Sequence, residues 1–244
     1  MFIERLTVIM YKYEMHLHSS LTSKCATSDS VEYVKRAVET GFAGMVLTNH
    51  FYRGNSAIDK SIPWCDFVEF YKRDWENAKE EGDKQDIDVI FGMEEGYGNG
   101  KECLIYGLTP KDFSECGDFP KMPIAEISAF VRSKGGFIAC AHPFRNRGYI
   151  TNPDLEPCAE YFDGVEVYNR GNSPEENIKA MEFAKKNDLI CIGGGDTHST
   201  SGFGAAGIIL PQRVCDGKEL VEMLKARKAR LISGGLFTEG DLYE

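Results

Sequence analysis

The sequence lacks the features that mark secreted and membrane-anchored chains. It has no apolar run near the roughly 20 residues that a membrane-spanning helix needs, and residues 1–15 carry charged side chains without a small-residue cleavage site. The eight cysteines form no CxxC pair, and Cys103, Cys140 and Cys191 lie in apolar strand-like runs, where cysteine behaves as a small hydrophobe. We therefore expect a cytoplasmic protein with reduced thiols and no membrane partner.

Positive charge is also scarce. The chain has 28 Lys and Arg residues against 38 Asp and Glu residues, which gives a formal net charge of −10. A balance of this sign argues against a long nucleic acid as a partner, because a phosphate backbone attracts basic surfaces. The sequence also has neither a P-loop ending in GK[ST] nor a GxSxG nucleophile elbow. Chemistry based on a phosphate-cradling loop or an esterase-type serine is therefore not indicated.

Short apolar runs alternate with longer segments of helical periodicity. The strand-like runs are 8–15, 43–49, 88–94, 102–108, 136–141, 163–169, 189–196, 205–211 and 230–233. The helical patterns occupy 28–41, 67–82, 123–136, 173–188 and 216–229. Repeated βα units imply parallel strands covered by helices, in either a barrel or a doubly wound open sheet. No repeat or flexible linker divides the chain, so we expect one α/β domain over residues 1–244.

The chain has only five histidines, and each lies at the end of a strand-like run or just past it. They are His16, His18, His50, His142 and His198. Residues two apart on a strand point to the same face, so the first two imidazoles are expected to share a metal ion. The carboxyl ends of the strands of a βα barrel converge on one face, where active sites lie. The sequence therefore predicts that all five imidazoles meet there.

Acidic residues occupy similar places along the chain. They are Glu94, Glu95, Glu102, Glu166 and Asp196. A mixture of imidazole and carboxylate ligands suits Zn, Mn or Fe, whereas Ca takes oxygen ligands and a structural Zn site normally recruits thiolates. A single histidine at a strand end is more often a hydrogen-bonded structural residue than a ligand. The joint placement of ten such residues favours a metal centre.

The ordered motifs resemble those of the PHP family, the polymerase and histidinol phosphatase metal hydrolases. The motifs are "EMHLHSS", "LTNH", "FGMEEG", "CAHPFR", "GVEVYN" and "GGGDTHS", which together span most of the chain. The resemblance implies a distorted (β/α)7 TIM-like barrel that holds two or three divalent metal ions, Mn, Fe or Zn, and hydrolyses phosphoesters.

The resemblance also implies a set of seven metal ligands. They are His16, His18, His50, Glu94, His142, Asp196 and His198. The HxH pair would share one metal with Glu94 and Asp196, Glu94 would bridge to a second metal that His142 also binds, and the remaining two histidines would belong to a third. Glu94 is preferred to Glu95 because the family pattern is Gly, any residue, Glu, and Gly92 sets that register.

Two positions depart from the family pattern. Many members have an Asp or His for the third metal where this chain has Ser23 and Lys24. Lysine at neutral pH has no lone pair to offer, so either Lys24 replaces the charge of the third cation or the loop brings in Cys25. Trinuclear relatives often have a His where this chain has Glu102, which would be either a ligand favouring Mn, Fe or Mg or a surface residue.

These residues together predict a metal-dependent phosphoesterase acting on a small phosphate ester or a nucleotide. A metal-bridged hydroxide would attack phosphorus, with Asp196 or His198 accepting or relaying a proton. Arg145, three residues past His142, would bind the phosphate through its fork of donors. Two alternatives stay open, a histidinol-phosphate phosphatase and a non-catalytic metal-binding module.

Overall fold

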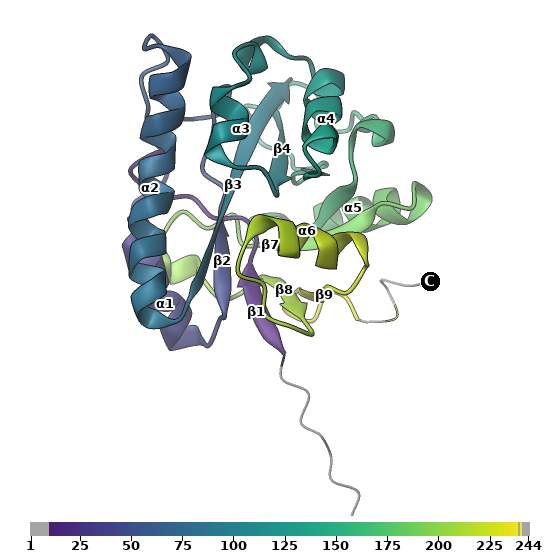
Figure 1. Cartoon of the computed structure of the whole chain (residues 1–244). Helices are drawn as coiled ribbons and strands as arrows, with labels where there is room; N and C mark the ends of the chain where they lie inside the picture. Colours follow the sequence, from purple (N-terminus) through teal and green to yellow (C-terminus); the bar gives the residue numbers. More distant parts are fainter. Residues whose placement is uncertain (1–9, 239, 241–244) are drawn as a thin grey trace, which may run out of the picture.

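A computed structural model of the chain describes residues 10–238 and 240 (Figure 1). Its strands are β1 (Tyr11–Glu14), β2 (Gly44–Leu47), β3 (Asp88–Gly98), β4 (Lys101–Tyr106), β5 (Phe137–Cys140), β6 (Gly164–Asn169), β7 (Ile190–Gly194), β8 (Gly207–Leu210) and β9 (Arg230–Ile232). Its helices are α1 (Ser30–Thr40), α2 (Trp64–Gln85), α3 (Pro110–Ser114), α4 (Ile124–Ser133), α5 (Pro174–Lys186) and α6 (Gly217–Lys225), with short 3-10 helices η1 (Phe119–Lys121), η2 (Ala159–Tyr161) and η3 (Thr200–Gly202). The expected first strand, 8–15, begins outside the described residues, and its later part forms β1.

One sheet joins these strands in the order β7-β6-β5-β4-β3-β2-β1-β8-β9. The groups β1–β2–β3 and β5–β6–β7 pair in parallel, whereas β4 and β8 are antiparallel to both of their neighbours. Because β7 also packs against β8 and β9, the sheet curls into a nearly closed barrel. The predicted α/β class with a distorted TIM-like barrel is confirmed. The single domain over residues 1–244 stays a prediction.

The strand β4 departs from the expected βα alternation. Gly98 pairs with Lys101, so Asn99 and Gly100 form a two-residue hairpin loop between β3 and β4. Both loop residues have positive φ, 56° and 73°, as a type I′ turn requires, and Asn-Gly is its preferred sequence. The hairpin reverses the chain, so the start of β4 lies beside the carboxyl end of β3. Glu102 thereby reaches the end of the barrel where the parallel strands terminate.

Helices cover the outer face of the sheet, and Figure 1 shows α1 and α2 along the flank formed by β2 and β3. The helix α1 begins where the Asp29 carboxylate accepts the Glu32 N–H, and it packs Tyr33 and Val34 into a core cluster with Met45 of β2. Between residues 10 and 238, no helix has both the length and the apolar character needed to cross a bilayer. Apolar side chains thus pack between the helices and the sheet, whereas polar side chains gather at the carboxyl ends of the parallel strands.

Gly194, the last residue of β7, lies directly against two of those polar side chains. A Cβ atom there would lie 2.5 Å from the His16 Cβ and 2.6 Å from Glu166 Oε1. We expect Gly194→Ala to lower the free energy of unfolding by about 1–3 kcal/mol, the usual cost of overpacking. Urea unfolding of the metal-free protein measures this difference. Gly148→Ala is the control, since its Cβ would enter open space, and equal midpoints for the two variants would contradict the argument.

Candidate metal centre

Polar side chains from five strands meet at the carboxyl end of the barrel. They are His16 and His18 after β1, His50 after β2, Glu94 within β3, His142 after β5, and Asp196 and His198 after β7. The loops after β1 and β7 are joined by backbone pairing, because the His18 N–H donates to the Thr197 carbonyl and the Thr197 N–H to the His16 carbonyl. The structure therefore brings together all seven residues that the sequence singled out.

Four residues contribute the tightest group of donor atoms in this centre. His16 Nε2 lies 3.0 Å from His18 Nε2, 3.2 Å from Glu94 Oε1 and 3.5 Å from Asp196 Oδ1. His18 Nε2 lies 3.2 Å from Asp196 Oδ1 and 3.4 Å from Glu94 Oε2. Ligand atoms about 2.0–2.2 Å from one cation are separated by such distances, and imidazole and carboxylate are its preferred donors. The residues present fit a divalent metal ion.

Glu94 also extends toward a second group of donors. Its Oε1 atom lies 3.0 Å from His142 Nε2, and its Oε2 atom lies 2.9 Å from His50 Nδ1. Glu102 lies 3.4 Å from His50 Nδ1 and 3.7 Å from His142 Nε2, so the hairpin between β3 and β4 has placed it in the centre. The adjacent Glu95 points to the opposite face of β3 and pairs with Arg53 instead.

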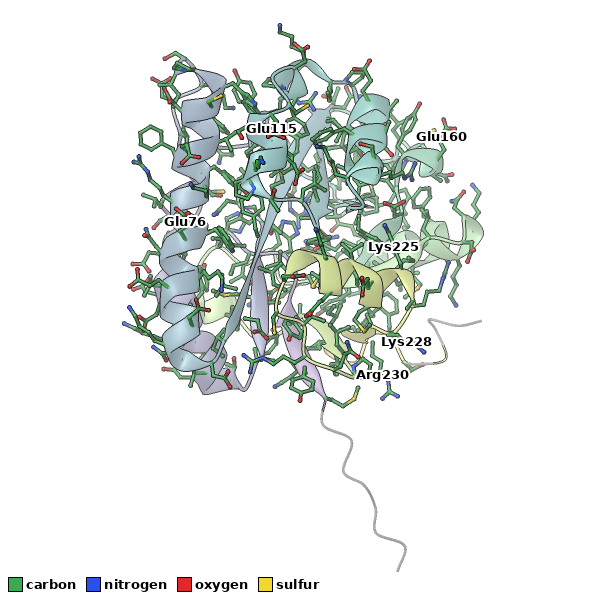
Figure 2. The ribbon with its side chains drawn as sticks, viewed as in Figure 1. Glu76, Glu115, Glu160, Lys225, Lys228 and Arg230 are labelled. Carbon is green, nitrogen blue, oxygen red and sulfur yellow. The ribbon has the colours of Figure 1, made fainter. Side chains whose placement is uncertain are left out.

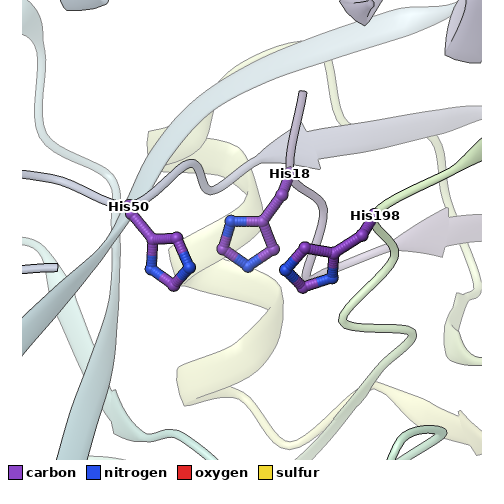
Figure 3. A group of neighbouring side chains, drawn as sticks. All are labelled: His18, His50 and His198. Atoms are coloured by element: carbon purple, nitrogen blue, oxygen red, sulfur yellow. The ribbon is translucent and has the colours of Figure 1, made fainter. Parts of the chain in front are cut away.

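A third group consists of three imidazoles, His18, His50 and His198, and Figure 3 shows His18 between the other two. The centroids of the His18 and His50 rings are 4.3 Å apart, and those of the His18 and His198 rings are 4.4 Å apart. Each residue offers one ligand nitrogen, and these nitrogens lie within 4.8 Å of one another. Such a spacing fits donors around a further cation.

Hydrogen bonds to Nδ1 leave the Nε2 lone pair of several imidazoles free. Glu166 Oε1 accepts from His16 Nδ1 at 2.8 Å, and the Asp196 carbonyl accepts from His198 Nδ1 at 2.8 Å. Ser23 donates its hydroxyl hydrogen to Asn49 Oδ1, so its oxygen serves His18 Nδ1 as an acceptor at 3.2 Å. Partners of this kind fix the tautomer and orientation that a metal ligand needs.

Two buried carboxylates, Glu14 and Glu166, hold the centre together. Neither was among the predicted site residues. Glu166 binds His16 and also accepts the His142 N–H. Glu14 Oε1 accepts the N–H groups of Met15, His16 and Gly195, and thereby ties the segment after β1 to the segment after β7. The sequence alone shows Glu166 as an acidic residue within the strand-like run "GVEVYN". The role of Glu14 depends on a contact across 181 positions, which no local pattern reveals.

Two of the candidate ligands have strained backbone conformations. His142 has φ 28° and Asp196 has φ 48°, in the left-handed region that non-glycine residues seldom occupy. Such conformations cost on the order of 1–3 kcal/mol each and persist where surrounding contacts determine them. Here the His142 N–H is held by Glu166, and the Asp196 carboxylate by Arg145 at 2.6 Å. Of the six non-glycine residues with positive φ in the described part of the chain, these two face the metal centre.

The ionisation of the centre follows from burial and from mutual charge. Burial opposes ionisation of Glu94 and Asp196, but the charge of His16 outweighs it and holds the pKa of each carboxyl well below its usual range. Burial likewise disfavours the charged form of His16, yet Glu166, Asp196 and Glu94 raise the pKa of that ring well above its usual value. Burial and the His50 charge lower the pKa of His18 to about 3. Without metal, protons on the His16 and His50 rings supply positive charge to the carboxylates.

Arg145, the predicted phosphate ligand, is buried and bound to the protein. Its Nη2 atom donates to Asp196 and to Asn169 at 2.8 Å, and its Nε atom donates to Asn172 at 2.9 Å. In this arrangement Arg145 orients Asp196, and its guanidinium still forms part of the cavity wall.

The metal centre forms the floor of a cavity of about 650 Å³. Three basic residues, Arg53, Lys101 and Arg145, contribute to its wall together with Tyr149. The Lys101 ammonium donates to the carbonyls of Pro143 and Leu155, and so fastens the loop after His142. The cavity lining thus places three basic residues beside the carboxylates of Glu94, Glu102 and Asp196, so its charge is more balanced than the net charge of the chain.

The family model for the PHP domain matches residues 14–187, and a model described as PHP-associated matches residues 174–229. Since the first match spans most of the chain and the candidate centre has the donors described above, the chain belongs to the PHP domain family. The resemblance noted in the motifs is confirmed.

Individual relatives agree with this assignment. DNA polymerase III PolC-type from Thermotoga maritima is 34% identical over 139 residues, which are 52% of this chain and 9% of that protein. A two-domain protein from Bacteroides vulgatus, containing a predicted PHP-like metal-dependent phosphoesterase, has a TM-score of 0.66 at 16% identity over 92% of this chain and 65% of its own. The lesion-specific endonuclease EndoQ from Pyrococcus furiosus has a TM-score of 0.64 at 12% identity, over 91% of this chain and 58% of its own.

The prediction that argued against a long nucleic acid was wrong. Endonuclease Q has the same fold, and its structure in complex with a 27-mer duplex substrate, abasic lesion at the active site, has a TM-score of 0.62 to this chain. The prediction used net charge alone, which averages over the whole surface. The field at a binding site depends on the charges that line it, and here these include Arg53, Lys101 and Arg145.

We expect Glu166→Gln to weaken metal binding by about 10–100-fold, because it replaces the carboxylate that orients His16 and raises its basicity. Competition with a fluorescent chelator measures the affinity. The control is Glu76→Gln, which removes a carboxylate from the outer face of α2 (Figure 2). Equal affinities for the wild type and both variants would show that Glu166 has no influence on the centre.

Metal binding is also expected to strengthen as the pH rises. The raised pKa values of His16 and His50 mean that these rings hold protons in the metal-free protein, and the metal must displace them. Raising the pH from about 6 to about 8 reduces this competition. Isothermal titration calorimetry in two buffers of different ionisation enthalpy measures the protons released. A pH-independent affinity with no proton release would refute the protonation scheme.

Proposed function

We propose that this chain is a metal-dependent phosphoesterase that hydrolyses a small phosphate ester or a nucleotide. The main support is the convergence of His16 Nε2, His18 Nε2, Glu94 and Asp196 Oδ1 within 3.0–3.5 Å of one another. Glu94 and Asp196 also line a cavity. Phosphoryl transfer needs cations that bind the phosphate oxygens and a water held in line with the leaving group. Membership of the PHP domain family supports this class of reaction.

In this proposal Glu94 is the central ligand. It contacts His16 and His142 through Oε1, and His18 and His50 through Oε2, so one carboxylate joins the three donor groups. A second cation would take His142, and a third would take His50 and His198. Mn, Fe and Zn all suit imidazole and carboxylate donors. When bound, the cations would polarise the phosphoryl oxygens and lower the pKa of water.

The surrounding residues would bind and orient the substrate. Arg53 and Lys101 place positive charge on the cavity wall, and Arg145 keeps Asp196 directed at the donor group. His198 is 33% exposed and donates Nδ1–H to the Asp196 carbonyl, which leaves Nε2 toward the cavity for a metal ion or for the proton of the leaving group. Asp196 would serve as ligand and proton acceptor.

The size of the cavity supports a ligand no larger than a nucleotide at the reacting end. Ligand sites commonly enclose about 300–1,000 Å³, and this cavity holds about 650 Å³. Tyr149 offers an exposed aromatic ring on the wall, which suits stacking against a base or another planar group. All eight cysteines are unpaired, which fits a reducing, cytoplasmic compartment.

Nucleic acid is the second candidate substrate. Endonuclease Q, which shares the fold, acts on duplex DNA, and the 34% identical relative is a DNA polymerase of which this chain spans only 9%. In that case the scissile phosphodiester would enter the cavity and the remaining strand would lie outside it.

The test is a hydrolysis assay of the Mn-loaded protein against p-nitrophenyl phosphate, nucleoside monophosphates, histidinol phosphate and a duplex with an abasic site. We expect hydrolysis of the first two, and a fall of about 100-fold or more in kcat/KM for Glu94→Gln, equivalent to about 2.7 kcal/mol. Glu76→Gln is the control and should match the wild type.

Each substrate tests a different activity. Cleavage of the duplex alone would make nucleic acid the substrate, and preference for histidinol phosphate would favour that phosphatase. Full metal loading with no hydrolysis of any substrate would favour a non-catalytic metal-binding module and overturn the proposal.

A further inference from the structure

Cys25 lies in the short segment that follows the HxH pair, and its backbone is fixed on both sides. The Lys24 N–H donates to the Asn55 carbonyl at 3.0 Å, and the Ala26 N–H to the Ser23 carbonyl at 3.1 Å. One residue further on, the Thr27 N–H donates to the His198 carbonyl at 2.8 Å. These bonds join the segment to the loop after His50 and to the loop that carries His198.

The position of the thiol follows from this anchoring. Cys25, His50 and His198 line the same cavity, and the Cys25 side chain interacts with both rings. The chain has seven other cysteines, and none of them lines this cavity. Lys24, the other residue considered for the third site, is exposed and does not belong to the cavity wall.

An independent observation beside these rings points to a cation ligand role for His50. His50 is only 8% exposed, and its Nδ1 atom lies 2.9 Å from Glu94 Oε2. Within the described part of the chain, neither of these two buried atoms has a hydrogen bond of good geometry. Buried polar atoms without a partner are costly and call for an explanation such as an ion. The nearby imidazoles of His18 and His198 supply further donors.

We propose that Cys25 supplies a thiolate ligand to a cation held by His50 and His198. The Sγ–metal bond forms as the thiol releases its proton to solvent, with no change in oxidation state. Thiolate is a soft ligand, so this position would select Zn, Co or Fe over Mg or Mn. The inference rests on the metal centre of the proposed function and adds a ligand that makes one position chemically different from the others.

The arrangement of the preceding residues supports this assignment. Ser23 donates to Asn49 and accepts from the His50 N–H and from His18 Nδ1, so its hydroxyl is fully used within the protein. It therefore orients His18 and has no lone pair left for the cation. Cys25 is the next side chain with a lone pair that reaches the two histidines.

The experiment loads the full chain with Co²⁺ and records its absorption spectrum and its metal content. A thiolate bound to Co²⁺ gives a charge-transfer band in the near ultraviolet, which imidazole and carboxylate ligands do not give. We expect the band in the wild type, its loss in Cys25→Ser, and a decrease of about one equivalent in bound metal. Cys215→Ser is the matched control, because Cys215 is exposed and lies outside the cavity, and it should keep both.

The outcomes separate this inference from the proposed function. A wild type that binds two or more equivalents without the band, or with a band that persists in Cys25→Ser, would overturn the role of Cys25 and leave the centre intact. A wild type that binds no metal would overturn both. Loss of the band in Cys25→Ser with retention in Cys215→Ser would support the thiolate ligand.

Discussion

The carboxyl end of this barrel is organised by the cost of burying negative charge. Glu14, Glu94, Glu166 and Asp196 are all removed from water within one small region. Burial of an unpaired carboxylate is expensive, so each must be met by donors or by positive charge. Backbone N–H groups donate to Glu14 Oε1, although Glu14 Oε2 has no hydrogen-bond partner. His16 and the His142 N–H bind Glu166, and Arg145 with the imidazoles binds Asp196. The positions of the loops after β1, β5 and β7 follow from these requirements.

The same constraint predicts that metal binding would stabilise the fold. Glu94 depends on the charges of His16 and His50 when no metal is present, and burial works against those charges. A divalent cation replaces two such protons and can be approached by several ligands at once. Because binding acts only on the folded state, it would stabilise the fold in proportion to the logarithm of the metal concentration.

Much of the fold and of the centre could be predicted from local pattern. The two-residue spacing of His16 and His18 and the strand-like runs before each histidine are local features, and they indicated one polar face on an α/β barrel. The hairpin between β3 and β4 also has a local signal, because Asn99-Gly100 is the preferred sequence of a type I′ turn. The alternation of strands and helices elsewhere in the chain led to a prediction without this hairpin. That omission left the place of Glu102 undecided, since the direction of β4 determines which end of the barrel its first residues reach.

Other features depend on contacts between distant segments, which sequence patterns do not encode. The guanidinium of Arg145 could bind either a phosphate group or a protein carboxylate, and only the fold shows that it binds Asp196. Ser23 looked like the loss of a metal ligand, yet its contacts with His18 and Asn49 show a hydroxyl that orients a ligand. The net charge misled the prediction about nucleic acid for a related reason, because it sums over the whole chain and does not show that Arg53, Lys101 and Arg145 line one cavity. In each case the role of a charged or polar residue depends on the neighbours that determine its hydrogen bonds and its field.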